Sequence, residues 1–121
     1  MDNDKNELDP ISLEIISNGL RSITDECFVA LTRSSYSTNI KERKDHSIAI
    51  VDKEGRLVVQ AAMTIPLHIA SMRGLMECIL KKFDGDISEG DVFVANDPHT
   101  AGGPHLPDIN YAMPIFVDGE I

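Results

Sequence analysis

The residues best suited to chemistry gather in one segment of fifteen residues, NDPHTAGGPHLPDIN, which runs from Asn96 to Asn110. It holds three prolines, two adjacent glycines, two histidines and two aspartates. A loop of this length is uncommon in a compact domain and is usually either functional or disordered. Because each proline fixes its own backbone φ angle, the segment is stiff, and we predict an ordered, functional loop.

Within this loop, His105 and Asp108 stand three residues apart. An imidazole nitrogen and a carboxylate are ligands that a divalent cation such as zinc, manganese or ferrous iron accepts. A third ligand must come from elsewhere, and Asp45, directly after the charged KERK run at 41–44, is the candidate. The rivals are Asp97, His99, His46 and His68. The alternative is that His105 and Asp108 only cap backbone groups of the loop.

Other residues of the loop are candidates for lining a binding site beside such a metal. Gly102 and Gly103 permit a positive φ angle or a close approach of the backbone to a ligand. His99 and Asp97 lie nearby in the sequence, although an aspartate before a proline is also a typical turn former. We therefore expect these four residues either to contact substrate or to shape the loop.

Two further residues have both a structural and a functional interpretation. His68 stands at the start of a predicted helix, where an imidazole can pack, cap the helix or bind a metal. Arg43, in the charged run, either meets an anionic substrate or faces solvent.

No glycine-rich phosphate loop and no GxSxG motif is present, so nothing in the sequence places a nucleotide or a serine nucleophile on this chain.

The elements that must position these residues begin with a long helix. Asp9-Pro10 is a helix start, because the carboxylate can cap free N–H groups and proline suits the first helical position. Apolar residues then recur at helical spacing over 10–33, namely Ile16, Leu20, Ile23, Cys27 and Leu31, with Phe28 beside them.

Residues 34–44 are predicted to be a surface connection. A β-hairpin is predicted next, because two β-rich runs, SIAIVD and RLVVQAAM, flank a turn at 52–55.

The second half of the chain predicts another helix and two further strands. Ile69, Met72, Leu75, Ile79 and Phe83 return at helical spacing, and Asp84-Gly85 ends that helix. Strands are predicted at 92–95 and 111–117, the latter leading into a hairpin turn at Asp118-Gly119. The fold class is therefore α+β, and we expect one antiparallel or mixed sheet with both helices on one face.

Composition excludes several classes of function. The chain has 121 residues, with 20 acidic against 11 basic side chains and a net charge of −9, which disfavours nucleic acid and anionic membrane surfaces as partners. No apolar run approaches a membrane span, and the acidic N-terminus is unlike a signal peptide. Cys27 and Cys78 stand alone, which predicts reduced, buried thiols in a cytoplasmic protein.

The last residues suggest that more chain follows. A hairpin turn comes two residues before the end, so no return strand is present, and we expect the sequence to be the amino-terminal piece of a longer polypeptide. Apolar surface should then be exposed, and the isolated piece should be poorly soluble. The alternative is a non-catalytic remnant or interaction module.

These motifs together resemble the hydantoinase B family. GDVFVANDPHTAGGPHLPDIN, from Gly90 to Asn110, is similar to that family's GDV strand and NDP…GG…HLPD loop. The segments DPI…EII…L…E at 9–26, NIKERKD at 39–45, IAIVDKEGRLVVQ at 48–60 and IPLHIASM at 65–72 fit as well. The resemblance implies that residues 9–121 are the amino-terminal portion of an incomplete hydantoinase B-type domain, preceded by a mobile arm at 1–8.

The resemblance also implies an activity and a site. It implies an ATP-dependent hydrolase of cyclic amides such as hydantoins and 5-oxoproline, with ATP and Mg bound by a hydantoinase A-type partner subunit. A ketone carboxylase subunit of the same family is the alternative. The implied metal ligands are Asp45, His105 and Asp108, completed by a histidine beyond residue 121.

Overall fold

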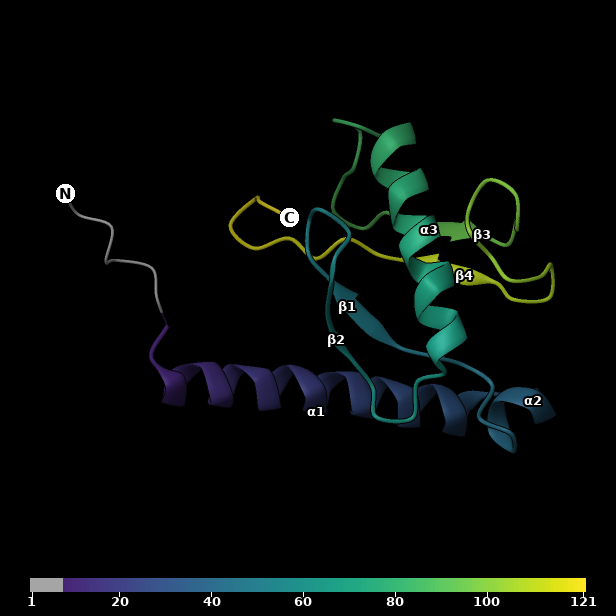
Figure 1. The fold of residues 1–121 in the computed structure, drawn as a ribbon, viewed down its shortest axis with the longest axis horizontal. Helices are drawn as coiled ribbons and strands as arrows, with labels where there is room; N and C mark the ends of the chain where they lie inside the picture. Colours follow the sequence, from purple (N-terminus) through teal and green to yellow (C-terminus); the bar gives the residue numbers. More distant parts are fainter. Residues whose placement is uncertain (1–7) are drawn as a thin grey trace.

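The computed structural model describes residues 8–121, so the expected arm at 1–8 lies outside the described residues except for Leu8. Helices and antiparallel strand pairs occupy separate stretches of the chain, which confirms the α+β class. The elements are α1 (Pro10–Ser34), α2 (Thr38–Lys41), β1 (Ala49–Val51), β2 (Leu57–Gln60), α3 (Pro66–Lys82), β3 (Phe93–Ala95) and β4 (Asn110–Ala112). Figure 1 shows α1 along one edge of the molecule, with the β1–β2 hairpin and α3 above it and β3 and β4 beside α3.

Helix α1 starts where the sequence predicts. The Asp9 carboxylate accepts hydrogen bonds from the backbone N–H groups of Ile11 (3.0 Å) and Ser12 (3.1 Å), and Pro10 occupies the first turn. These contacts satisfy two of the free donors that every helix start exposes. The predicted helix over 10–33 is confirmed to within one residue at its end.

The buried side of α1 differs from the predicted apolar stripe. Only Thr24 and Phe28 are buried on this helix, because the hairpin covers a short stretch of it. Cys27 is exposed, so the prediction of a buried thiol is wrong there. The large apolar side chains left exposed on α1 are Ile11, Leu13, Ile15, Ile16, Ile23, Val29 and Leu31. The expected exposed apolar surface is therefore present, both along this helix and on residues 92–121, where Val94, Tyr111 and Met113 are also exposed.

The connection after α1 contains the short helix α2, which the sequence analysis did not predict. Beyond it, β1 and β2 pair antiparallel, with Ile50 opposite Val59, and the predicted hairpin is confirmed. Its turn is held by Asp52, whose carboxylate accepts from the backbone N–H of Glu54 (3.0 Å) and of Arg56 (2.8 Å). The hairpin thereby returns the chain across α1 toward the start of α3.

Helix α3 and the β3–β4 pair form the second half of the fold. Leu75 and Ile79 of α3 form a buried core with Ala101 from the long loop between β3 and β4. The buried Ser71 hydroxyl donates to Asn110 Oδ1 at the start of β4 (3.1 Å). The long loop is therefore fixed to α3 both at its middle and at its end.

The expected single sheet is not formed. The strands make two separate two-stranded sheets, β1–β2 and β3–β4, and each lies against its own helix, α1 and α3 respectively. Each strand is only three or four residues long, and each pair packs on a different helix, so the two pairs do not join into one sheet.

The predicted strand at 111–117 is shorter than expected. Pairing with β3 ends at Ala112, and Pro114, which has no backbone N–H to donate, follows shortly after. The predicted turn at Asp118-Gly119 is confirmed: both residues have positive φ angles (51° and 83°), and Val117 and Glu120 exchange backbone hydrogen bonds. Over residues 8–121 the structure has no helix with the length and hydropathy needed to span a bilayer.

Candidate functional site

Three segments that are distant in the sequence meet at one cluster of histidine and aspartate side chains. Asp45 comes from the connection between α2 and β1, His68 from the first turn of α3, and His105 and Asp108 from the long loop between β3 and β4. We refer to these four residues as the Asp-His cluster. The cluster unites the predicted residues Asp45, His105 and Asp108 with one of their rivals, His68.

The distances within the Asp-His cluster centre on His68 and Asp108. His68 Nε2 lies 3.7 Å from Asp45 Oδ1 and 3.8 Å from Asp108 Oδ2, while His105 Nε2 lies 2.8 Å from Asp108 Oδ1. The side chains of His68 and Asp108 are 16% and 24% exposed, whereas those of Asp45 and His105 are 46% and 61% exposed. The cluster thus has a shielded side at His68 and an open side at His105.

Asp45 is positioned by its neighbours on both sides. Its backbone N–H donates to the carbonyl of Asn39 at 2.9 Å. Lys44 before it has a φ angle of 55°, a left-handed conformation that is uncommon for a side chain of this kind. His46 after it is buried, stacks on Phe28 with 4.0 Å between ring centroids, and has its Nε2 3.2 Å from the Phe28 carbonyl. His46 therefore anchors this segment on α1, away from the Asp-His cluster.

His68 is held by Ser47. The Ser47 hydroxyl oxygen accepts the backbone N–H of Ile65 at 2.9 Å and lies 2.9 Å from His68 Nδ1. The ring is thereby oriented with Nε2 toward the two carboxylates. From the sequence, His68 is a rival third ligand that could equally pack or cap the helix, and it stands outside the proposed set of Asp45, His105 and Asp108. The sequence feature that could have indicated its role is its position in the first turn of a helix that begins at Pro66.

The long loop is held in place by its own turn and by α3. Asp97 accepts hydrogen bonds from the backbone N–H of His99 (2.8 Å) and from the Thr100 hydroxyl (2.6 Å), which confirms it as a turn former. His99 itself is exposed. Gly102 has a φ angle of 70° and passes so close to Gly74 of α3 that a Cβ on either glycine would lie 2.6 Å from the Cα of the other. The predicted close approach at Gly102 is therefore to the helix backbone.

Gly103 is buried in the same turn but has ordinary spacing. A Cβ on this residue would lie 3.6 Å from the Asn96 carbonyl oxygen. Asn96 in turn donates from its side-chain amide to the Leu106 carbonyl at 2.8 Å, which joins the two sides of the loop between His105 and Asp108. Substrate contact by Asp97, His99, Gly102 or Gly103 remains a prediction.

The hydrogen bonds to Asp97 give a test of the loop geometry in solution. The Thr100 hydroxyl and the His99 N–H hold the pKa of Asp97 below its ordinary value of 3.8. Because these bonds favour the ionised form, their contribution to stability is present above pH 3.8 and is lost as pH falls through the lowered pKa. An NMR titration of the carboxyl carbon should therefore show a pKa below that of Asp97 in a Thr100→Val variant. Equal pKa values in the two proteins would contradict the loop geometry.

The donor set of the Asp-His cluster fits a divalent cation chemically. Two carboxylates and two imidazoles are ligands for zinc, manganese and ferrous iron, and their metal bonds of about 2.0–2.2 Å place neighbouring donor atoms about 3.0–3.6 Å apart. Over residues 8–121, however, no three histidine, cysteine, aspartate or glutamate side chains are already arranged to enclose a metal ion. A cation here would require His105 to turn away from Asp108, and its exposure leaves it room to do so.

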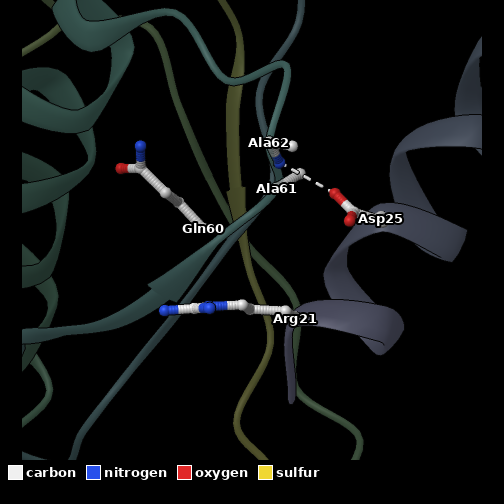
Figure 2. A pocket seen from close by; sticks show the side chains of 5 residues that line it. All are labelled: Arg21, Asp25, Gln60, Ala61 and Ala62. Carbon is white, nitrogen blue, oxygen red and sulfur yellow. Dashed lines mark hydrogen bonds between the residues drawn. The ribbon is translucent and has the colours of Figure 1, made fainter. Parts of the chain in front are cut away.

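A separate hollow lies between α1 and the end of β2. It is lined by Arg21, Asp25, Gln60, Ala61 and Ala62 and has a volume of about 330 Å³. Figure 2 shows Asp25 directed from α1 toward the hairpin, where its Oδ1 accepts the backbone N–H of Ala62 at 2.8 Å. None of the Asp-His cluster lines this hollow. Asp25 thus joins the hairpin to α1 and is not part of the candidate metal centre.

Comparison with known proteins identifies relatives over nearly the whole chain. The family described as Hydantoinase B/oxoprolinase matches residues 9–121. A 5-oxoprolinase from Dictyostelium discoideum is 40% identical over 115 residues, which cover 95% of this chain and 9% of that protein. The 5-oxoprolinase of Saccharomyces cerevisiae is 39% identical over 110 residues, covering 91% of this chain and 8% of that protein.

A relative of another name matches a similar span. The caprolactamase subunit beta of Pseudomonas jessenii is 32% identical over 116 residues, which cover 96% of this chain and 20% of that protein. The chain thus spans about a tenth of the length of the 5-oxoprolinases and a fifth of the caprolactamase subunit. No solved structure matches the chain.

Proposed function

The chain belongs to the hydantoinase B/oxoprolinase family, and on that basis we propose that it is part of an ATP-dependent hydrolase that opens cyclic amides. Relatives named for 5-oxoproline and for caprolactam support a substrate with a ring amide. The observation that carries the proposal is the Asp-His cluster, in which Asp45, His68 and the His105–Asp108 pair converge from three separate segments.

We place a divalent cation, zinc, manganese or iron, at Asp45, His105 and Asp108. Such an ion would polarise the ring carbonyl or activate a water for attack on it. Asp108 is in the position to link the cluster, since its Oδ2 lies 3.8 Å from His68 Nε2 and its Oδ1 lies 2.8 Å from His105 Nε2. His105, on the open side, is the ligand nearest to where a substrate would enter.

We assign ATP binding to a hydantoinase A-type partner subunit. A relative that is itself named as a subunit beta supports an assembly of more than one chain. The exposed apolar side chains of α1 offer surface that such a partner could cover.

The substrate class is tested by coupling ring opening to ATP turnover. In the intact assembled protein, 5-oxoproline, caprolactam or a hydantoin should raise the rate of ATP hydrolysis, with the ring-opened amino acid formed in step with ADP. Acetone with bicarbonate serves as the comparison substrate. If only the ketone and bicarbonate stimulate ATP hydrolysis, the cyclic amide proposal is wrong and a carboxylase is indicated.

A further inference from the structure

His68 occupies a place in the Asp-His cluster that the proposed ligand set does not explain. Its ring is mostly shielded, and Nε2 is nearly equidistant from Asp45 Oδ1 (3.7 Å) and Asp108 Oδ2 (3.8 Å). Both distances exceed a hydrogen bond by about 0.8 Å, so a small movement of either carboxylate would complete one. The question is whether this nitrogen presents a proton or a lone pair.

The surroundings of Ser47 favour a proton on Nε2. Within residues 8–121, the Ser47 hydroxyl oxygen contacts the Ile65 N–H, from which it accepts, and His68 Nδ1. If Nδ1 carried the proton, two N–H groups would point at this oxygen and the hydroxyl proton would lack a partner. With Nδ1 as acceptor, the hydroxyl donates to it and all three groups are satisfied.

The charges around Nε2 also favour a proton on this nitrogen. A bare Nε2 would direct its lone pair at two anionic oxygens, which is repulsive, whereas an Nε2–H group attracts both. The donor also lies between two carboxylates of like charge and offsets their mutual repulsion. Carboxylates that bind metals are commonly held by such outer hydrogen bonds.

We propose that His68, with its proton fixed on Nε2 by Ser47, is a positioning residue that orients the Asp45 and Asp108 carboxylates for a divalent cation without binding the cation itself. This inference rests on the proposed function, since it takes Asp45, His105 and Asp108 as the ligands. It predicts a specific tautomer and a specific pattern of rescue among variants of His68.

The test uses Mn²⁺ alone as the probe and the intact protein. Mn²⁺ affinity, followed by electron paramagnetic resonance, should fall about 10- to 100-fold in His68→Ala. Most of the affinity should return in His68→Gln, whose amide N–H can take the place of Nε2, but not in His68→Asn, whose amide reaches only the Nδ1 position. Ser47→Ala should weaken binding in the same direction but to a smaller extent.

A second measurement needs no metal. Nitrogen NMR of the imidazoles, at a pH where they are uncharged, should show His68 protonated at Nε2 in the wild type and a mixture of tautomers in Ser47→Ala. A bare Nε2, or a His68→Ala variant that binds Mn²⁺ as tightly as wild type, overturns the inference.

Failure of the underlying proposal would look different. If His105→Ala binds Mn²⁺ like the wild type, the ligand assignment itself is wrong, whatever His68 does. If His105→Ala loses Mn²⁺ and all His68 variants keep it, the ligands stand and only the positioning role is lost. A melting curve of each variant in the absence of metal establishes that the compared proteins are folded.

Discussion

Under the proposed function, replacing His105 by alanine is expected to abolish binding of the proposed divalent cation and to lower the rate of cyclic amide opening by about a hundredfold or more. The side chain is the open-side member of the Asp-His cluster, with its Nε2 2.8 Å from Asp108 Oδ1. Because it is 61% exposed, its removal should cost little stability, so the effect would fall on the site and not on the fold. Elemental analysis for zinc, manganese and iron, with steady-state kinetics of the assembled protein, measures both effects.

The adjacent Leu106→Ala provides the matched control for that experiment. Leu106 lies in the same loop and is 63% exposed, and the contact it makes with Asn96 uses its backbone carbonyl, which the substitution keeps. Metal content and rate should therefore stay close to wild type. Asp108→Asn, which keeps the shape and removes the charge, should reproduce the loss seen in His105→Ala. Equal metal content in wild type and His105→Ala would remove the assignment.

Replacing Gly74 by alanine is expected to destabilise the protein although alanine is the better helix former. The new Cβ would lie 2.6 Å from the Gly102 Cα, a backbone atom that cannot turn aside. Forcing α3 and the loop apart should cost about 1–3 kcal/mol, as overpacking of a close contact does. The free energy of unfolding in urea gives the cost, and the loop that carries His105 and Asp108 should lose metal affinity with it.

Gly19→Ala separates this effect from helix propensity. Gly19 lies within α1, and a Cβ there would meet nothing within 4 Å. Alanine should therefore stabilise the helix by about 0.5–1 kcal/mol. If both glycine variants gain stability alike, the contact between α3 and the loop does not have the geometry described.

The local elements followed from the sequence because their causes are local. The Asp9-Pro10 start, the turn at Asp52 and the Asp118-Gly119 turn depend on residues within four positions of each other. The length of β4 was overestimated because strand pairing depends on a distant partner, and β3 is only three residues long. The short helix α2 escaped prediction because one turn carries too little periodic pattern.

The burial of α1 shows where local patterns are insufficient. The apolar stripe predicted a helix correctly, yet Ile16 and Ile23 are about half exposed and the buried residues are Thr24 and Phe28. An apolar stripe indicates which face of a helix gains from burial, but the face that is actually buried depends on which other element packs against the helix. Here the hairpin covers a neighbouring face, attached through Asp25 and His46.

The sequence by itself determined the residue types of the candidate site, because His105, Asp108 and the prolines that stiffen their loop all lie in one short segment. It also supplied Asp45 as a candidate, next to a charged run. Only the tertiary structure brought Asp45 and His68 to that loop, because their approach depends on His46 packing on α1, Ser47 holding the start of α3, and two glycines letting the loop touch that helix. Contacts between distant segments arise from the packing of whole elements, and no local pattern records them.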